Sequence, residues 1–379
     1  MAPRLPSSEV RGGGHDAGRA ARVKGGLTCP RSRGPAVVRC KEGLVVTSED
    51  VARYVGVSQP TVSRALRDDP KVSRATKARV REAARLLGYV PSATGRALAV
   101  GRSHRIGLLL TDVENAFYPH LIAPLYRELL RAGYEMVLLA EADDTSPIAE
   151  RIVANGLDGV VLTTSTTDSA LPIRLKDRGM PFVYLNRTVP AVPADSVVVD
   201  STTGYRELAE RLRELGHSRV GALLGPVNTS TGLHREGVLR EALSAADLVL
   251  DEAAVRRGPY DVAAGRDGMR EILQLERRPS VVVCGNDVVA VGALNAAAEA
   301  GVSVPAEISV VGFDDLPMAG WPVLDLATVA FDLPEMARAA VGLIADRVEG
   351  RGGPGRRQKV FPTALVQRGS LAEAPVRGA

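Results

Sequence analysis

The stretch TSEDVARYVGVSQPTVSRALR, residues 47–67, decides the N-terminal fold of this chain. Two short helical patterns, residues 49–55 and 59–67, flank the tripeptide Gly56-Val57-Ser58. Glycine suits a turn that needs a positive φ, and serine suits the N-cap of the following helix. Apolar side chains recur at helical spacing in both segments and predict a small shared core, made of Val51, Ala52, Val55, Val57, Val62 and Leu66.

The outer face of the second predicted helix is polar and basic. Amides, hydroxyls and guanidinium groups are the side chains that contact base edges and phosphates in DNA complexes. An ordinary corner between two helices of a bundle is the alternative interpretation. The coincidence of turn glycine, cap serine, small Ala52 and polar face favours a DNA-binding helix-turn-helix. We predict that its DNA contacts include Gln59, Thr61, Ser63, Arg64 and Arg67.

A third helix is predicted after the turn at residues 68–70. Ser73 is its predicted N-cap, Leu87 its last residue and Gly88 its C-terminal cap. We therefore predict one DNA-binding domain over residues 44–90. Its basic side chains are expected to face phosphate or solvent: Arg74, Lys77, Arg79, Arg81 and Arg85.

Charge is unevenly distributed along the chain. Residues 1–43 carry nine Lys/Arg against three Asp/Glu, and residues 44–103 carry eleven against five, so each segment has a net charge of +6. Because the whole chain is +4, residues 104–379 sum to −8. Residues 1–43 are rich in Gly, Arg, Ala and Pro without periodicity, which predicts a disordered basic tail. A basic head on an acidic body indicates a nucleic-acid module joined to a domain with another task.

Composition narrows the remaining classes. The chain has 379 residues, 45% of them apolar and 4% aromatic, which is enough for two or three domains with aliphatic cores. No apolar run reaches the roughly 18 residues of a membrane span, and no secretory signal opens the chain, so we expect no membrane association and a cytoplasmic protein. The three cysteines and five histidines show no spacing typical of a disulfide framework or a metal site, and we expect neither a metal nor a cofactor.

From Arg105 onward, apolar strands alternate with amphipathic helices. The predicted strands are 106–110, 135–140, 159–162, 181–185, 196–199, 219–225, 280–285 and 308–313. This alternation predicts parallel sheets that are covered by helices on both faces. Ligands of such sheets bind outside the carboxyl ends of the strands. The segments at that edge are 112–117, Asn186-Arg187, 226–235, Asn286-Asp287 and Asp314-Asp315.

Four segments in order carry a close resemblance to a known family. They are DVARYVGVSQPTVSRAL, VSRATKARVREAARLLGYVPS, VDSTTGYRELAERLRELGHSRVGALLGP and CGNDVVAVGALNAAAEAGVSVPAEISVVGFDD. Over about residues 47–370 the chain resembles the lactose/purine-repressor (LacI) family of transcriptional regulators. The resemblance implies a three-helix DNA-binding head, a hinge helix at 91–103, and a dimerising core at 104–370. That core would have two doubly wound, parallel-sheet α/β lobes like a periplasmic binding protein, the first at about 104–198 plus 331–348 and the second at about 199–330 plus 349–370.

The resemblance also implies roles in DNA binding. Gln59 and Pro60 would begin the recognition helix in the major groove, with Arg64 one turn further. Pro60 departs from the commoner polar residue and, lacking a donor, offers only apolar contact, for example to a thymine methyl. Leu98 matches a leucine that wedges into the minor groove, and a linker leucine is the alternative interpretation. The phosphate contacts implied by the resemblance are Ser63, Ser73 and Thr76.

The effector site is expected at the strand ends. Asn186 and Asp314 match residues that bind sugar hydroxyls, and Asn286 with Asp287 forms a matching pair whose alternative interpretation is a helix N-cap. Phe117 and Tyr260 are candidate stacking platforms. The family places an arginine three residues before a glycine, where this chain has His234 followed by Arg235, so either side chain is a candidate. The complete predicted set is Asn115, Phe117, Asn186, His234, Arg235, Tyr260, Asn286, Asp287 and Asp314.

These features together predict a regulator, most consistent with a repressor, that binds a pseudo-palindromic DNA operator as a homodimer at the nucleoid. A sugar or a related polyhydroxylated metabolite would bind between the two lobes, as inducer or as corepressor. A solute-binding protein without a regulatory role is the alternative, but it would need an export signal and no basic head. An enzyme is disfavoured because the chain has no GxGxxG or GxxxxGK[ST] loop after a strand and no GxSxG elbow.

Overall fold

The computed structural model describes residues 46–90, 102–111, 114–140 and 148–375. The predicted tail at 1–43 lies outside these residues, as do residues 91–101 of the predicted hinge, including Leu98. By its internal contacts the chain divides into an N-terminal unit that ends at Pro91 and a second unit that begins at Ser92. The two units are therefore described separately.

The N-terminal unit is a three-helix domain, with α1 Ser48–Val55, α2 Gln59–Leu66 and α3 Arg74–Leu87. Thr47 caps α1 through a capping box with Asp50, and Gly56 ends that helix at a φ of 72°. Ser58 occupies the N-cap position of α2, but its hydroxyl bonds the Thr61 hydroxyl at 2.9 Å and no helix amide. The three helices bury a small aliphatic core that includes Val51, Val55, Val62, Ala65, Val80 and Ala83.

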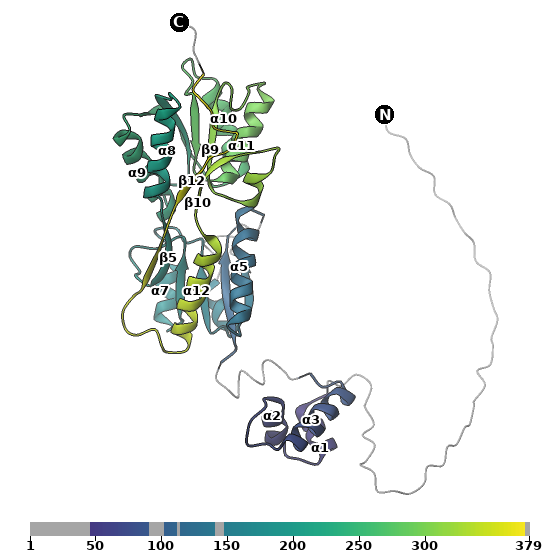
Figure 1. The fold of residues 1–379 in the computed structure, drawn as a ribbon. Coiled ribbons are helices and arrows are strands. Elements are labelled where there is room, and N and C mark those ends of the chain that lie inside the picture. The colour runs from purple at the N-terminus through teal and green to yellow at the C-terminus, as the bar shows by residue number, and fades with distance from the viewer. Residues whose placement is uncertain (1–45, 91–101, 112–113, 141–147, 376–379) are drawn as a thin grey trace, which may run out of the picture. The chain divides into compact units, whose positions relative to one another are not determined.

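The second unit contains two α/β lobes, each built on a six-stranded sheet (Figure 1). The first sheet has the order β11-β5-β4-β3-β1-β2 and the second has the order β12-β10-β9-β8-β6-β7. The described strand pairs are parallel except for β10 with β12. The predicted fold class, a helix-turn-helix head followed by two parallel-sheet lobes, is confirmed.

The first lobe covers both faces of its sheet with helices. Helices α5 and α12 pack on one face over the aliphatic cluster around Leu121 and Ile344. Helices α6 and α7 cover the other face around Ile152 and Leu175. Its elements are β1 Arg105–Leu110, α5 Phe117–Arg131, β2 Glu135–Ala140, α6 Ile148–Ala154, β3 Gly159–Leu162, α7 Leu171–Asp177, β4 Phe182–Leu185, β5 Asp195–Asp200, α12 Leu333–Val348 and β11 Gln358–Pro362.

The second lobe repeats this arrangement. Helices α8 and α9 cover one face around Leu208 and Leu239, and α10 and α11 cover the other around Met269 and Ala293. Its elements are α8 Thr202–Glu214, β6 Arg219–Leu224, α9 Ser230–Ala245, β7 Val249–Arg257, α10 Val262–Leu273, β8 Val281–Cys284, α11 Asp287–Glu299, β9 Ser309–Asp314, the 3₁₀ helix η1 Pro317–Gly320, β10 Ala327–Ala330 and β12 Ala364–Val366.

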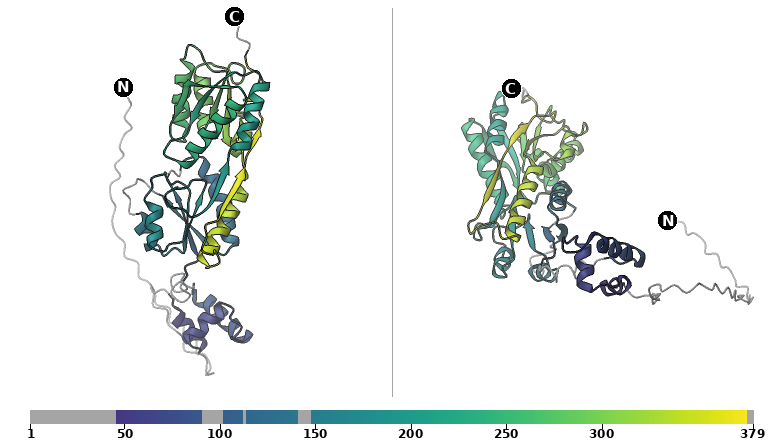
Figure 2. Two further views of the ribbon diagram at one scale, coloured as in Figure 1. Left: turned by 90° about the vertical axis from the view of Figure 1, so that its left-hand side faces the viewer. Right: turned by 60° about the horizontal axis from the view of Figure 1, so that its bottom comes forward.

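The chain passes between the lobes three times, after β5, between β10 and α12, and between β11 and β12. Figure 2 shows the last passage as the yellow ribbon that runs from one lobe to the other. Phe331 lies at the second passage and packs against the cores of both lobes. At the third, the Thr363 hydroxyl donates to the Asp200 carbonyl and accepts from the Gly204 amide, both at 3.0 Å. Two of the passages are thereby tied to each other.

One predicted lobe boundary is wrong in part. The prediction places residues 349–370 in the second lobe, but β11 pairs with β5 in the first sheet. Only the following strand, β12, joins the second sheet. The error has a physical reason, because β11 is an exposed edge strand of sequence QKVFP and lacks the continuous apolar run of a buried strand. In the described part of the chain, no helix is long and apolar enough to span a membrane.

Candidate functional site

The outer face of α2 presents the side chains that the sequence predicts for DNA contact. Gln59 and Pro60 are exposed at the start of the helix, and the Gln59 amide donates to the Ser48 hydroxyl at 3.1 Å. The Nε atoms of Arg64 and Arg67 donate to carbonyls four residues earlier at 3.3 Å. Neither guanidinium is paired with a carboxylate within the described residues. Both therefore keep their charge available for a ligand outside the domain.

Most basic side chains of α3 pair with carboxylates, and one donates to a backbone carbonyl. Lys77 and Arg81 pair with Asp68, and Arg85 pairs with Glu82. The Arg79 guanidinium donates to the Val55 carbonyl at 2.6 Å and so satisfies the C-terminal end of α1. Arg79, Lys77 and Arg81 thus link α3 to other segments of the domain, whereas the Arg85 pair lies on the exposed surface of α3 itself.

Ser73 and Thr76, predicted to contact phosphate, form the cap of α3. The Ser73 hydroxyl accepts from the Thr76 amide at 3.2 Å and lies 2.9 Å from the Thr76 hydroxyl. The cap satisfies one of the free amides at the helix start. Any contact of these hydroxyls with phosphate has to coexist with that bond.

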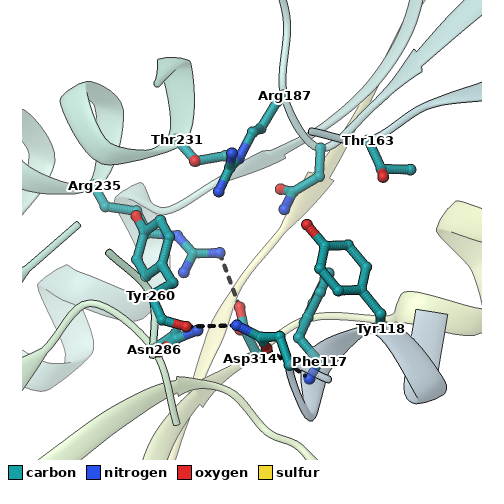
Figure 3. A pocket seen from close by; sticks show the side chains of 11 residues that line it. Phe117, Tyr118, Thr163, Arg187, Thr231, Arg235, Tyr260, Asn286 and Asp314 are labelled. Carbon is teal, nitrogen blue, oxygen red and sulfur yellow. Dashed lines mark hydrogen bonds and ion pairs between the residues drawn. The ribbon is translucent and has the colours of Figure 1, made fainter. Parts of the chain in front are cut away.

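A cavity lies between the two lobes of the second unit, at the carboxyl ends of their strands (Figure 3). It encloses about 400 Å³ not filled by protein atoms, part of it open to solvent. The cavity is lined by Asn115, Phe117, Tyr118, Thr163, Asn186, Arg187, Thr231, Arg235, Tyr260, Asn286 and Asp314.

Hydrogen bonds join the lobes around this cavity. The Asn115 amide, after β1, donates to the Tyr260 carbonyl of the second lobe at 2.6 Å. The Thr188 amide donates to the Ser230 hydroxyl at 2.9 Å, and the Thr167 amide donates to the Asn228 carbonyl at 2.8 Å. The Thr167 hydroxyl also donates to the Asn228 carbonyl at 3.2 Å, so polar contacts join the lobes around the cavity.

A buried ion pair forms one wall. The Arg235 guanidinium donates to Asp314 Oδ1 at 2.9 Å and to the Gly285 carbonyl at 2.6 Å, and its Cζ lies 3.7 Å from the centroid of the Phe313 ring. Burial raises the pKa of Asp314 to about 6, and the Arg235 guanidinium opposes that shift. The pair is therefore a fixed, desolvated donor and acceptor set at the edge of the cavity.

Backbone strain is concentrated in the lining. Asn186 has a φ of 70° and Asp314 a φ of 104°, in a region that non-glycine residues rarely adopt. Such conformations persist where the surrounding structure holds them, and they cluster at binding sites. Asn186 follows the buried strand β4 and Asp314 is the last residue of the buried strand β9, and both line the cavity.

Tyr260 fills a space that two glycines leave open. A Cβ atom at Gly225 would collide with the Tyr260 ring, and one at Gly285 would lie 3.0 Å from it. The ring has the Arg187 and Arg235 guanidinium carbons each 5.8 Å from its centroid. Its hydroxyl and Asn186 Oδ1 are buried without a hydrogen-bond partner within the described residues. Both atoms keep a hydrogen-bonding capacity that no described residue uses.

Family models match both units of the chain. The model of bacterial regulatory proteins of the lacI family covers residues 47–92, and the model of the periplasmic binding protein-like domain covers residues 209–371. The HTH-type transcriptional repressor CytR of Escherichia coli strain K12 is 30% identical over 339 residues, which are 88% of this chain and 99% of that protein. The chain belongs to the LacI family of bacterial transcriptional regulators.

Solved structures of this family share the fold. The transcriptional regulator CelR–cellobiose complex is 30% identical, with a TM-score of 0.65 over 86% of this chain and 100% of that one. The lac repressor dimer bound to operator and the anti-inducer ONPF is 24% identical, with a TM-score of 0.77 over 86% and 99%. The resemblance inferred from the four sequence segments is thus confirmed. The LacI family is one of DNA-binding repressors and not of enzymes.

Seven of the nine predicted effector residues line the cavity of this LacI-family core: Asn115, Phe117, Asn186, Arg235, Tyr260, Asn286 and Asp314. The Asn286 side chain also accepts from the Val289 amide at 2.9 Å, so it caps α11 as well. Of the two candidates His234 and Arg235, it is Arg235 that lines the cavity. His234 Nε2 instead accepts from the Ser201 amide at 3.3 Å, beside the first passage between lobes.

Asp287 does not reach the cavity. Its carboxylate accepts from the Leu316 amide at 2.7 Å and the Thr328 hydroxyl at 2.6 Å. Burial, together with the nearby Asp314 charge, raises the pKa of Asp287 to about 8. Asp287 therefore supports the turn after β9 from behind and is a structural carboxyl group in this arrangement.

Four lining residues were not selected from the sequence: Tyr118, Thr163, Arg187 and Thr231. Thr163 directly follows β3, and Arg187 directly follows Asn186, so the strand-end rule marks both positions. Tyr118 and Thr231 lie in the first turns of α5 and α9. Their approach to the cavity depends on the orientation of each helix, which the sequence pattern does not give.

Proposed function

We propose that this LacI-family protein represses transcription as a homodimer on a pseudo-palindromic operator, under the control of a small polyhydroxylated ligand bound between its lobes. One observation carries the proposal: a chain with an exposed polar recognition face also has a cavity lined mainly by amides, hydroxyls and charged groups. Such groups suit a ligand with many hydroxyls, and the aromatic rings suit its apolar faces. The likeness to the CelR–cellobiose complex supports a sugar-like ligand.

The proposed DNA contacts start at the N-terminus of α2. Gln59, Thr61 and Arg64 would read base edges, and Pro60 would add apolar contact because its ring nitrogen cannot donate. Arg67 and the hydroxyls of Ser63, Ser73 and Thr76 would contact phosphates. Leu98 would enter the minor groove at the operator centre. Because the operator is chromosomal DNA, we place the protein in the cytoplasm at the nucleoid.

Regulation would follow from a shift in population between two arrangements of the lobes. A ligand that contacts Asn186 and Thr163 from the first lobe and Arg235 and Asp314 from the second stabilises the arrangement in which all four converge. The shift requires different affinities of the ligand for the two arrangements, and the same coupling acts in reverse on DNA affinity. A ligand that weakens DNA binding is an inducer, and one that strengthens it is a corepressor.

The proposal is tested in two steps with the full-length protein. Enrichment from a random duplex library gives the preferred sequence, and fluorescence anisotropy then measures its affinity against a scrambled duplex. A thermal-shift screen of sugars, sugar phosphates and nucleosides identifies ligands, and each hit is added to the anisotropy titration. A chain that binds all duplexes equally, or whose specific affinity no stabilising ligand changes, would contradict the proposal.

The hinge role of Leu98 has its own test. Leu98→Ala should weaken specific binding more than nonspecific binding, because an inserted leucine contributes only where the operator is kinked. The control variant is Val100→Ala, which truncates another apolar side chain two residues away in the predicted hinge. An equal loss of affinity for operator and scrambled DNA in Leu98→Ala would exclude the hinge role.

A further inference from the structure

We infer that the ligand of the interlobe cavity carries a negative charge, and that the Arg187 guanidinium is its counter-charge. The ligand class that fits is a polyhydroxylated carboxylate or phosphate, that is, a sugar acid or a sugar phosphate. This inference rests on the proposed function and narrows its ligand from sugar-like compounds in general to anionic ones.

The charges that line the cavity do not balance. The lining has two cationic side chains, Arg187 and Arg235, and one anionic side chain, Asp314. Arg235 and Asp314 neutralise each other at 2.9 Å, and Arg235 also binds the Gly285 carbonyl. Arg187 has no carboxylate within 4.0 Å in the described part of the chain. The described lining therefore has one positive charge in excess.

Arg187 has few other partners. Its Nη1 donates to the Thr164 carbonyl at 3.4 Å, which is long for a hydrogen bond, and its Cζ lies 5.8 Å from the Tyr260 ring centroid. Figure 3 shows its side chain entering the cavity from the side opposite Asp314 and Phe117. Several other half-buried arginines of the same unit are paired with carboxylates, as Arg368 is with Asp315 at 2.7 Å. Arg187 thus holds free donors in the space that a ligand would fill.

The ends of three helices add to the positive potential. Helices α5, α9 and α11 have 15, 16 and 13 residues, and residues at or next to their first turns line the cavity: Phe117, Thr231 and Asn286. The N-terminal end of a helix carries a partial positive charge that favours anions. These three helix ends and Arg187 act in the same direction, and within the described lining Asp314 is the single opposing charge.

A neutral sugar would satisfy only part of this lining. Its hydroxyls could bond to Asn186 Oδ1 and the Tyr260 hydroxyl, which are buried and have no hydrogen-bond partner among the described residues. It would also displace water from Arg187 and leave the guanidinium without an anion, which is unfavourable. A carboxylate or phosphate accepts two parallel bonds from a guanidinium and removes that cost. The lining therefore selects for hydroxyls and an anionic group together.

The test uses matched pairs of probes on the full-length protein. Gluconate, galactonate, mannonate and the corresponding hexose 6-phosphates are each compared with the neutral hexose, and inorganic phosphate is added alone. Binding is measured by thermal shift and calorimetry for wild type, Arg187→Gln, Arg187→Lys and Arg127→Gln. The last variant removes the same charge from an exposed arginine of α5 that does not line the cavity.

We expect anionic probes to raise the Tm of the wild type and of Arg127→Gln more than their neutral counterparts do. Arg187→Gln should weaken the best anionic probe at least about tenfold in Kd, and Arg187→Lys should restore part of the loss. A preference for hexonates or for hexose phosphates identifies the anionic group, and a response to inorganic phosphate that requires Arg187 locates the charge site by itself. The Tm without ligand should not fall in Arg187→Gln, because no ion pair is lost.

Two results would overturn the inference. One is a neutral hexose that binds the wild type as tightly as its anionic counterpart. The other is an equal response of wild type and Arg187→Gln to every anion, the absence of any response included. If a neutral hexose changes operator affinity, the proposed function stands while this inference fails. If an anion binds through Arg187 without changing operator affinity, the inference stands while the proposed regulation fails.

Discussion

The buried pair of Arg235 and Asp314 predicts a pH-dependent cost when the arginine alone is removed. Arg235 is 5% exposed and Asp314 is 6% exposed. Breaking a buried pair by deleting one partner costs about 3–5 kcal/mol, because the remaining charge stays desolvated. Arg235→Met leaves a carboxylate that can take up a proton, whereas Asp314→Ala leaves a guanidinium that cannot lose one. The two single variants should therefore respond differently to pH.

The sign follows from proton binding. Burial already raises the pKa of Asp314 to about 6 in the folded state, against about 3.9 in an unfolded chain, and loss of Arg235 raises it further. Above about pH 6 the folded variant binds a proton that the folded wild type does not, so the stability of the variant relative to wild type increases as pH falls from the variant's higher pKa to about 6, by up to about 1.4 kcal/mol per pH unit. The loss of unfolding free energy in Arg235→Met relative to wild type should therefore be greatest at pH 8 and smaller by roughly 1–3 kcal/mol at pH 5. The loss of stability in Asp314→Ala should instead grow by about 1.4 kcal/mol between pH 8 and pH 5, because only the wild type is stabilised by protonation of Asp314.

Urea unfolding at pH 5, 6, 7 and 8, followed by fluorescence of the single tryptophan Trp321, measures these differences in the same lobe. The double variant Arg235→Met/Asp314→Ala controls for packing and should cost less than the sum of the single variants, since the desolvated charge is gone. A deficit of Arg235→Met that is the same at pH 5 and pH 8, together with additive single costs, would refute the reasoning.

Three further predictions concern other parts of the chain. Gly265→Ala, where a Cβ would meet the Val289 carbonyl of α11, should destabilise the second lobe by about 1–3 kcal/mol or more. Gly342→Ala in α12, with open space around it, should stabilise by up to about 1 kcal/mol, and chemical denaturation of both variants tests the contrast. Arg79→Met removes the bond to the Val55 carbonyl and should lower the Tm of the head with DNA specificity unchanged, as circular dichroism and anisotropy would show. Arg64→Ala should cost about 1–3 kcal/mol of specific binding if its guanidinium reads a base; a mere decrease in the salt dependence would place it on phosphate.

The sequence predicted the parts of this fold that rest on local rules. Helices α1 to α3 were found because their caps, turn glycine and apolar spacing are local signals, and the structure agrees at Gly56, Ser73 and Gly88. The eight strands predicted from apolar runs are all present. The strands β7, β10, β11 and β12 were missed because they are short or have exposed positions, so no apolar run marks them.

The cavity was predictable as a location but not as a set of contacts. The strand-end rule directed attention to Asn186 and Asp314, which line the cavity. The same rule included Asp287, which the structure turns away toward Leu316 and Thr328. The direction of a side chain at a strand end depends on the backbone of the turn and on what packs behind it. The sequence pattern alone does not determine that direction.

The question of Arg235 or His234 shows how a motif can mislead by one position. Counting back from Gly237 selects His234, but α9 is continuous from Ser230 to Ala245 and its rotation places Arg235 toward Asp314. On a helix, one residue corresponds to a rotation of about 100°, so neighbours face different directions. His234 then lies at the passage between the lobes, 3.9 Å from Asp200. Arg235 therefore lines the cavity, and His234 lies apart from it at the passage between the lobes.

The same geometry limits how the lobes can move. Phe331 belongs to the apolar clusters of both lobes, and Thr363 ties the first passage to the third, so the passages are packed on the side of α8 and β12. Across the cavity, by contrast, the contacts are single hydrogen bonds such as that of Asn115 with the Tyr260 carbonyl. Packed apolar contacts resist separation more than a few polar contacts that water can replace. Rotation of the lobes should therefore pivot at the passages and open the cavity side. An anion bound between Arg187 and the second lobe would oppose that opening, because it would add an attraction between the lobes across the cavity.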